Sequence, residues 1–196
     1  MAIPATLRGT ILHGQSVTLR PPVPDDASSL FAPTHGDEER NSVWTYMAYG
    51  PWPSEEAFTE WVAERAASSD PLWFTVERES SPVGMATMCN YAPEHRRVEL
   101  GHIWYIPSAQ RTVVNTEATY LLLKHSFESY QARRVEWKAD ARNERSRAAA
   151  LRLGFSFEGI FRQHMIVKGE NRDTVWFAMT DGDWPEVEAR LRAKLA

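Results

Sequence analysis

The chain has 196 residues, enough for one domain with a sizeable buried core. Apolar residues make up 43 % and charged residues 24 %, a balance that excludes bulk disorder. The 22 basic residues are outnumbered by 26 acidic ones, and this net charge of −4 argues against a nucleic-acid-binding protein. The single cysteine, Cys89, excludes a disulfide framework and any multi-cysteine metal centre.

Membrane and export signals are not found in the sequence. No stretch reaches the roughly 18 consecutive apolar residues of a membrane span. The first residues lack the basic region and long apolar core of a signal peptide. We therefore expect a cytoplasmic protein with neither a membrane nor a nucleic acid as partner.

The first half of the chain mixes strand and helix patterns. Val17–Arg20 alternates and stops at a proline pair, which predicts a strand, and Asp25 is a candidate cap for a short helix after it. Ser54 precedes acidic residues and an apolar 3–4 spacing, which predicts a helix start. Leu72–Arg78 and Val83–Tyr91 are separated by turn residues, so we expect an antiparallel hairpin.

The second half predicts strands and helices in alternation. Asn143 and Gly154 have the residue types of a helix cap and a helix stop. The expected elements are a strand at Arg97–Ile106, a helix at Asn115–Tyr130, a strand around residues 135–139, a helix at Arg145–Leu153, strands at Phe155–Phe161, His164–Val167 and Thr174–Met179, and a last helix from Asp183 onward. The strand–helix–strand units permit parallel pairing across residues 97–139 and 134–161. The order predicts an α/β or α+β fold with a mixed sheet.

The stretch from Gln110 to Ala118 leads from the end of a strand into a helix. A helix start leaves backbone N–H groups without partners, and together with the helix dipole these groups suit a pyrophosphate. Neither a dinucleotide-binding glycine motif nor a Walker A motif is present.

Short motifs follow one another in a specific order: Val17-Thr-Leu-Arg20-Pro, Val83-Gly84, Val98-Glu99-Leu-Gly101, Asn115-Thr-Glu-Ala118, Asn143-x-x-Ser146, Arg152-Leu-Gly-Phe155 and Glu158-Gly159. This order resembles the GNAT superfamily of acyl-CoA-dependent N-acyltransferases, in the branch related to ribosomal-protein N-terminal alanine acetyltransferases. The resemblance covers about residues 17–180 of a single expected domain, residues 1–196. It implies a mixed, mostly antiparallel six- to seven-stranded sheet flanked by helices.

The resemblance also implies acetyl-CoA as cosubstrate and no metal. The residues it assigns to cosubstrate binding are Ile103, Trp104, Tyr105, Ile106, Arg111, Thr112, Val113, Val114, Asn115, Thr116 and Asn143. Val113 and Asn115 depart from the glycine or alanine usual in the family's phosphate loop. Glycine allows close approach of the backbone, but a valine in helical conformation still offers its N–H group.

Glu99 resembles the carboxylate that takes a proton from the substrate amine, because only a neutral amine attacks a thioester. It is predicted to share a strand face with Gly101, Ile103 and Tyr105. The structural alternative is an ion pair of Glu99 with Arg96 or Arg97.

Ser146 resembles the hydroxyl that protonates the departing thiolate of coenzyme A. As a residue in the first turn of a helix, it is also a candidate for a local backbone cap. Tyr105 is the alternative acid, and its structural alternative is packing in the core.

Four aromatic residues, Trp44, Tyr46, Tyr49 and Trp52, correspond to the segment that borders the acceptor site in the family. An aromatic wall would hold an apolar side chain or a cation. The alternative is a hydrophobic plug beneath the first helices.

The resulting hypothesis is an N-acetyltransferase that moves an acetyl group from acetyl-CoA to a primary amine by direct attack in a ternary complex. The amine could belong to a small molecule, a peptide or a protein N-terminus, and the protein could be a monomer or a homodimer. The alternative is a non-catalytic acyl-CoA-binding or regulatory module with the same fold.

Overall fold

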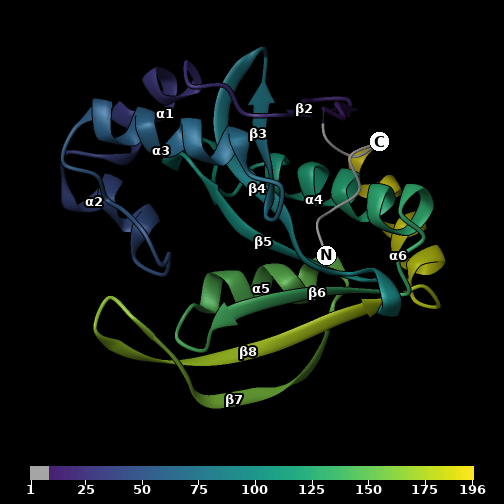
Figure 1. Ribbon diagram of the computed structural model, residues 1–196. Coiled ribbons are helices and arrows are strands. Elements are labelled where there is room, and N and C mark those ends of the chain that lie inside the picture. Colours follow the sequence, from purple (N-terminus) through teal and green to yellow (C-terminus); the bar gives the residue numbers. More distant parts are fainter. Residues whose placement is uncertain (1–8) are drawn as a thin grey trace.

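The computed structural model describes residues 9–196 and contains one eight-stranded sheet (Figure 1). Its strands are β1 (Leu12–His13), β2 (Val17–Arg20), β3 (Leu72–Arg78), β4 (Ser81–Ala92), β5 (Arg97–Tyr105), β6 (Arg134–Asp140), β7 (Ser156–Val167) and β8 (Glu170–Thr180). They lie in the order β1-β2-β3-β4-β5-β6-β8-β7. Only the β5–β6 pair is parallel among these strands, so the predicted mixed, mostly antiparallel sheet is confirmed.

The predicted number of six to seven strands is wrong, because β1 is too short to leave an alternating pattern in the sequence. The runs expected at Phe155–Phe161 and His164–Val167 form the single strand β7, whose interruption is an irregularity in its pairing with β8. Parallel pairing across residues 134–161 is also not observed. The hairpin returns β8 to a position beside β6, and β7 becomes the edge strand.

The helices are α1 (Asp26–Thr34), α2 (Glu38–Asn41), α3 (Glu55–Ala67), α4 (Val114–Lys124), α5 (Glu144–Leu153) and α6 (Trp184–Leu195), with short turns η2 (Ser42–Trp44), η3 (Pro93–His95) and η4 (Pro107–Ala109) and a π-helical turn η5 (His125–Ser129) that extends α4. None of the helices within residues 9–196 has the length and apolar character needed to cross a membrane.

The predicted helix boundaries are confirmed at two caps and wrong at one. Ser54 accepts a hydrogen bond from the backbone of Ala57, and Asn143 accepts one from the backbone of Ser146. The side chain of Asp25 makes no such bond at the start of α1. The neighbouring Asp26 instead accepts from the backbone N–H of Val23, since its carboxylate points toward the sheet.

Two hydrophobic clusters cover the two faces of the sheet. Alternate residues of a strand point to opposite faces, so Phe74 of β3 joins the larger cluster with α4 and α6, whereas Trp73 joins the smaller one with α1 and α3. The smaller cluster is mainly aromatic and contains Trp44, Phe58, Trp61 and Trp104. We call it the aromatic cluster.

A bulge in β5 changes which residues share a face. Gly101 pairs with Thr87 and Trp104 pairs with Met85, so two residues of β5 lie opposite one residue of β4. His102 adopts a left-handed φ of 49° at this point. The predicted common face of Glu99 and Tyr105 is therefore wrong, because the extra residue turns Tyr105 into the larger hydrophobic cluster.

Strands β5 and β6 pair only over their first residues. The parallel register joins Arg97–Leu100 to Arg134–Trp137, and beyond these residues the two strands diverge (Figure 1). An opening forms between them in the middle of the sheet, and the candidate site lies there.

Candidate active site

A cavity of about 1330 Å³ occupies the opening between β5 and β6. It is bordered by the second half of β5, the end of β6, the starts of α4 and α5, the segment 42–48, and residues of β7 and β8. Glu136 and Lys138 point to one face of the sheet, whereas Trp137 between them packs in the larger cluster on the other face. Because Trp137 and Lys138 both line the cavity, the cavity connects the two faces.

The start of α4 forms one end of the cavity. Arg111, Thr112 and Asn115 line it, and the left-handed backbone of this loop is at Arg111, with a φ of 60°. Val113 has ordinary helical dihedrals, with φ −63° and ψ −22°, so a valine fits here without strain. Val114 is fully buried in the core and does not line the cavity.

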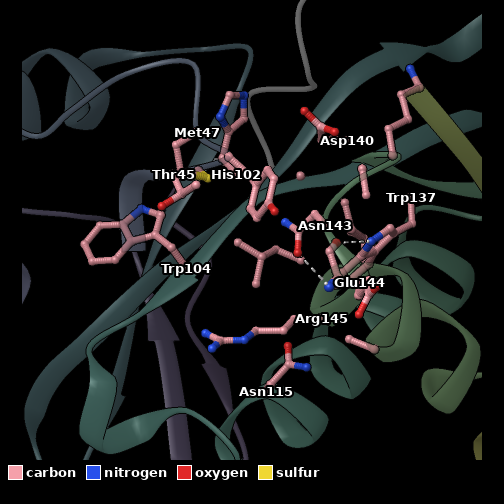
Figure 2. A pocket seen from close by; sticks show the side chains of 18 of the residues that line it. Thr45, Met47, His102, Trp104, Asn115, Trp137, Asp140, Asn143, Glu144 and Arg145 are labelled. Carbon is pink, nitrogen blue, oxygen red and sulfur yellow. Dashed lines mark hydrogen bonds between the residues drawn. The ribbon is translucent and has the colours of Figure 1, made fainter. Parts of the chain in front are cut away.

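Three cationic side chains at this end have no carboxylate partner within residues 9–196: Arg111, Arg145 and Arg152. Arg152, in the last turn of α5, donates a hydrogen bond of 2.6 Å to Thr116 in the first turn of α4, which joins the end of α5 to the start of α4. Figure 2 shows Arg145 on the side of the pocket where Asn115 lies. Guanidinium groups beside a helix N-terminus make a suitable environment for phosphate.

The β5 edge supplies a second feature for an extended ligand. From Gly101 onward β5 has no partner on its β6 side, so backbone groups on that edge face the cavity. Of the residues assigned to cosubstrate binding on this edge, Ile103, Trp104 and Tyr105 line the cavity, whereas Ile106 does not. The Ile106 N–H group donates instead to the carbonyl of Val83, at 2.9 Å.

Glu99 lies in the cavity and is 8 % exposed. Its Oε2 atom accepts a hydrogen bond from Asn90 and an ion pair from Lys138, each at 2.7 Å. The expected structural partner Arg97 pairs with Glu136 instead, at 2.8 Å. The other oxygen of Glu99 lies toward Gly101, where a methyl group on that residue would approach it to 3.4 Å. The missing side chain of Gly101 thus keeps this oxygen accessible.

Ser146 lies on the other side of the opening, in the first turn of α5. Its Oγ accepts a hydrogen bond of 3.0 Å from the indole N–H of Trp137, while its backbone N–H donates to Asn143 at 3.0 Å (Figure 2). An indole N–H can only donate, so the hydroxyl hydrogen of Ser146 remains available for another acceptor. The cap of this helix is thus Asn143, and the hydroxyl of Ser146 makes no hydrogen bond to the backbone within residues 9–196, so the predicted capping role of Ser146 is not observed.

Tyr105 is less suited to the role of acid. Its hydroxyl donates to Asn115 at a long 3.4 Å, and the side chain is 6 % exposed within the larger cluster. Burial raises the pKa of this phenol well above its ordinary value.

Only one of the four predicted acceptor residues lines the cavity. Tyr46 lines the cavity, and its hydroxyl donates to the carbonyl of Arg142 at 3.2 Å. Trp44 is fully buried, and Tyr49 and Trp52 pack around it in the aromatic cluster. The arrangement matches the hydrophobic plug more closely than a wall of the cavity. Three assigned cosubstrate residues, Val113, Val114 and Thr116, likewise do not line the cavity, although Thr112 and Asn143 do.

Sequence reasoning missed three cavity residues of chemical importance: Trp137, Lys138 and Arg172. Alternation along residues 135–139 places Lys138 on the polar face, which is the only signal that the sequence offers for it. Its partnership with Glu99 depends on the parallel register of β5 and β6, which no local pattern encodes.

Comparison with known proteins places this geometry among acetyltransferases. Residues 16–156 match the family described as "Acetyltransferase (GNAT) domain". The structure superposes on that of a GCN5-related N-acetyltransferase from Brucella melitensis with a TM-score of 0.92 and 34 % identity, covering 100 % of this chain and 90 % of that one. RimJ of Mycobacterium smegmatis, solved in complex with CoA-disulfide, gives a TM-score of 0.78 and 25 % identity, covering 95 % of each chain.

A sequence relative agrees with these structures. The Bacillus subtilis protein named "Putative ribosomal N-acetyltransferase YdaF" is 26 % identical over 174 residues, which cover 87 % of this chain and 94 % of that protein. The fold and the matches define an acyltransferase enzyme. The chain belongs to the GNAT acetyltransferase family, and its named relatives agree with the ribosomal-protein acetyltransferase branch that the motifs resemble. Enzymes of this family use acetyl-CoA as cosubstrate.

Proposed function

We propose that the protein acetylates a primary amine by direct attack on acetyl-CoA in a ternary complex, with Glu99 as the proton acceptor and Ser146 as the proton donor. One observation carries the proposal: both groups reach the same cavity from opposite faces of the sheet. The amine can approach from one face while the leaving sulfur departs on the other. Proton acceptance and proton donation are thus assigned to two different side chains.

The residues at the α4 end fit the cosubstrate. Arg111, Arg145 and Arg152 would hold its phosphates, and the unpaired β5 edge would hold its amide-containing arm, with Asn143 nearby. When bound, acetyl-CoA supplies the thioester carbonyl that the amine attacks. Backbone N–H groups of the β5 edge would then polarise this carbonyl.

Glu99 supports the amine side of the reaction. Lys138 and Asn90 both hold Oε2, so the orientation of the carboxylate is fixed while Oε1 remains open beside Gly101. An amine arriving as ammonium donates a proton to this oxygen, directly or through water, and becomes a nucleophile.

Ser146 supports the leaving-group side. Since Trp137 occupies an acceptor site of its Oγ, the hydroxyl hydrogen is directed to another partner, and the departing sulfur would receive it. Asn143 orders the turn through the backbone of Ser146 and leaves the side chain free.

The test is an acetyl-transfer assay with acetyl-CoA and an amine panel: amino acids, peptides with free N-termini, polyamines and aminoglycosides. We expect release of coenzyme A with at least one class, and loss of that release in a Glu99→Gln, Ser146→Ala double variant. Coenzyme A binding without turnover of any amine would support the non-catalytic module instead.

A further inference from the structure

Arg172 is an unpaired cation in the part of the cavity near Glu99. It lies on β8, opposite Met165 of β7, and both residues line the cavity. Its Nε atom is buried and has no hydrogen-bond partner in the described part of the chain. A buried polar group without a partner is costly, so such a group in a cavity indicates a ligand that supplies the partner.

The two carboxylates that act electrostatically on Arg172, Asp140 and Glu99, are already paired with other cations. Asp140 accepts hydrogen bonds from the guanidinium of Arg142 at 3.0 and 3.2 Å, and Glu99 pairs with Lys138 at 2.7 Å. Arg172 nevertheless lies within electrostatic range of both: burial lowers its pKa, while the charges of Asp140 and Glu99 oppose that shift. The guanidinium is therefore left with a positive charge that no described carboxylate neutralises through contact.

This charge lies on the amine side of the opening. Thr174 and Trp176 lie on the same face of β8 as Arg172, because they are two and four residues further along the strand. The ammonium of Lys138 lies over the ring of Trp176, 3.9 Å from the ring centroid. Lys138 in turn holds Glu99, so Arg172 and the proposed proton acceptor belong to the same face. On the other face, Arg111 before α4 and Arg145 and Arg152 of α5 line the cavity.

We infer that Arg172 binds an anionic group of the acceptor, and that the acceptor is a primary amine carrying a carboxylate a few bonds away. The inference rests on the proposed function and specifies its substrate class. A guanidinium binds a carboxylate through two parallel hydrogen bonds, which fixes the orientation of the molecule as well as its affinity. The same charge disfavours polyamines, because their second ammonium would face Arg172.

Two sources could supply this chemistry: the α-carboxylate of a free amino acid, or an acidic side chain next to the N-terminus of a peptide. Two matched probe pairs separate them. Alanine is compared with alaninamide, and the dipeptide amide Ala-Asp-NH₂ is compared with Ala-Asn-NH₂. Binding is measured by calorimetry with coenzyme A present, so that no acetyl transfer is needed, and acetylation of the same probes is measured separately.

We expect a carboxylate probe to bind at least about tenfold more tightly than its amide, since a charge-assisted hydrogen bond contributes that much or more. Arg172→Gln should remove this preference and Arg172→Lys should retain part of it, with coenzyme A affinity unchanged in both. The control is Arg162→Gln on β7, which removes an exposed arginine that does not line the cavity. It should leave every affinity unchanged.

Equal binding of acid and amide in both pairs, or no binding of either carboxylate probe, would overturn the inference. So would weakened coenzyme A binding in Arg172→Gln, which would assign the residue to the cosubstrate. Arg172-dependent binding without acetylation of any probe would contradict the proposed function and leave the inference standing.

Discussion

One face of the sheet has two different environments: aromatic side chains in one half and ion pairs in the other. Beside β3 and β4 this face carries the aromatic cluster, where His102 of β5 stacks on Tyr49 and lies near Trp73. Beside β6 and β8 the same face carries a network of charges in which Lys138 links Glu99 to Glu136. His102 and Glu99 belong to one strand, yet His102 packs among aromatic rings whereas Glu99 contacts Lys138 and Asn90.

The difference shows that two residues of one strand, His102 and Glu99 of β5, can have very different electrostatic surroundings. Burial and, to a smaller extent, the nearby cations Arg65 and Arg172 together lower the pKa of His102 to about 4. Glu99, also buried, keeps two donors at 2.7 Å. The aromatic half therefore disfavours the ionised form of His102, whereas in the ionic half Glu99 is held by Lys138 and Asn90.

The largest expected effect is that of Ser146→Ala. A general acid contributes about 10²- to 10⁴-fold to the rate, so kcat should fall within that range while the dissociation constant of acetyl-CoA changes little. The α5 cap should survive, since Asn143 accepts from the backbone of Ser146 and not from its hydroxyl. Steady-state kinetics and calorimetry measure the two quantities. A loss of kcat below about threefold would give the role to solvent or Tyr105.

Glu99→Gln comes next, with a rate loss of about 10²-fold near neutral pH. At higher pH more of the amine arrives already neutral, so the ratio of wild-type to variant rates should shrink. The measurement is kcat/KM across pH with one amine. The matched control is Glu158→Gln, which removes a carboxylate paired with Arg134 outside the cavity. A ratio that stays constant with pH would leave Glu99 a positioning or structural carboxylate.

The aromatic half is tested by the pH dependence of stability. Since the folded-state pKa of His102 is about 4 and its ordinary value is 6.5, the unfolded chain takes up this proton first as pH falls. The contribution of neutral His102 to the free energy of unfolding is fully present above about pH 6.5 and is lost toward pH 4. At pH 5 the loss amounts to about 2 kcal/mol.

Urea unfolding of wild type and His102→Gln at pH 7 and pH 5 isolates this contribution. The variant should lose less stability on acidification than the wild type, because its glutamine does not titrate. His35 and His125, whose pKa values are also lowered by burial, remain in both proteins and cancel in the difference. Exposed His95→Gln is the control. If the wild type and His102→Gln lost the same unfolding free energy between pH 7 and pH 5, the aromatic half would not disfavour the charged form of His102.

The sequence predicted what depends on local pattern. Caps at Ser54 and Asn143, the β3–β4 hairpin and the order of the GNAT motifs are encoded by neighbouring residues, and each is present. It could not predict the bulge at His102, because an inserted residue in a strand leaves no signature in alternation until the partner strand is known. The errors about Tyr105 and the missed role of Lys138 both follow from that kind of non-local register.

The smallest effect is expected for Trp137→Phe, on the opposite face of the sheet. Trp137 is 4 % exposed and packs against Phe155, yet its N–H donates to Ser146 at 3.0 Å. Phenylalanine keeps most of the packing and removes only the donor, so kcat should fall about tenfold as the serine hydroxyl loses its orientation. If Trp137 were only structural, Trp137→Phe would lower the rate by the same factor in the wild type and in Ser146→Ala. We therefore expect no further loss when Trp137→Phe is added to Ser146→Ala, a non-additivity that a double-mutant cycle measures.

Trp184→Phe is the control for a general loss of core packing. Trp184 is similarly buried but stacks on Phe127, so this variant should leave kcat unchanged.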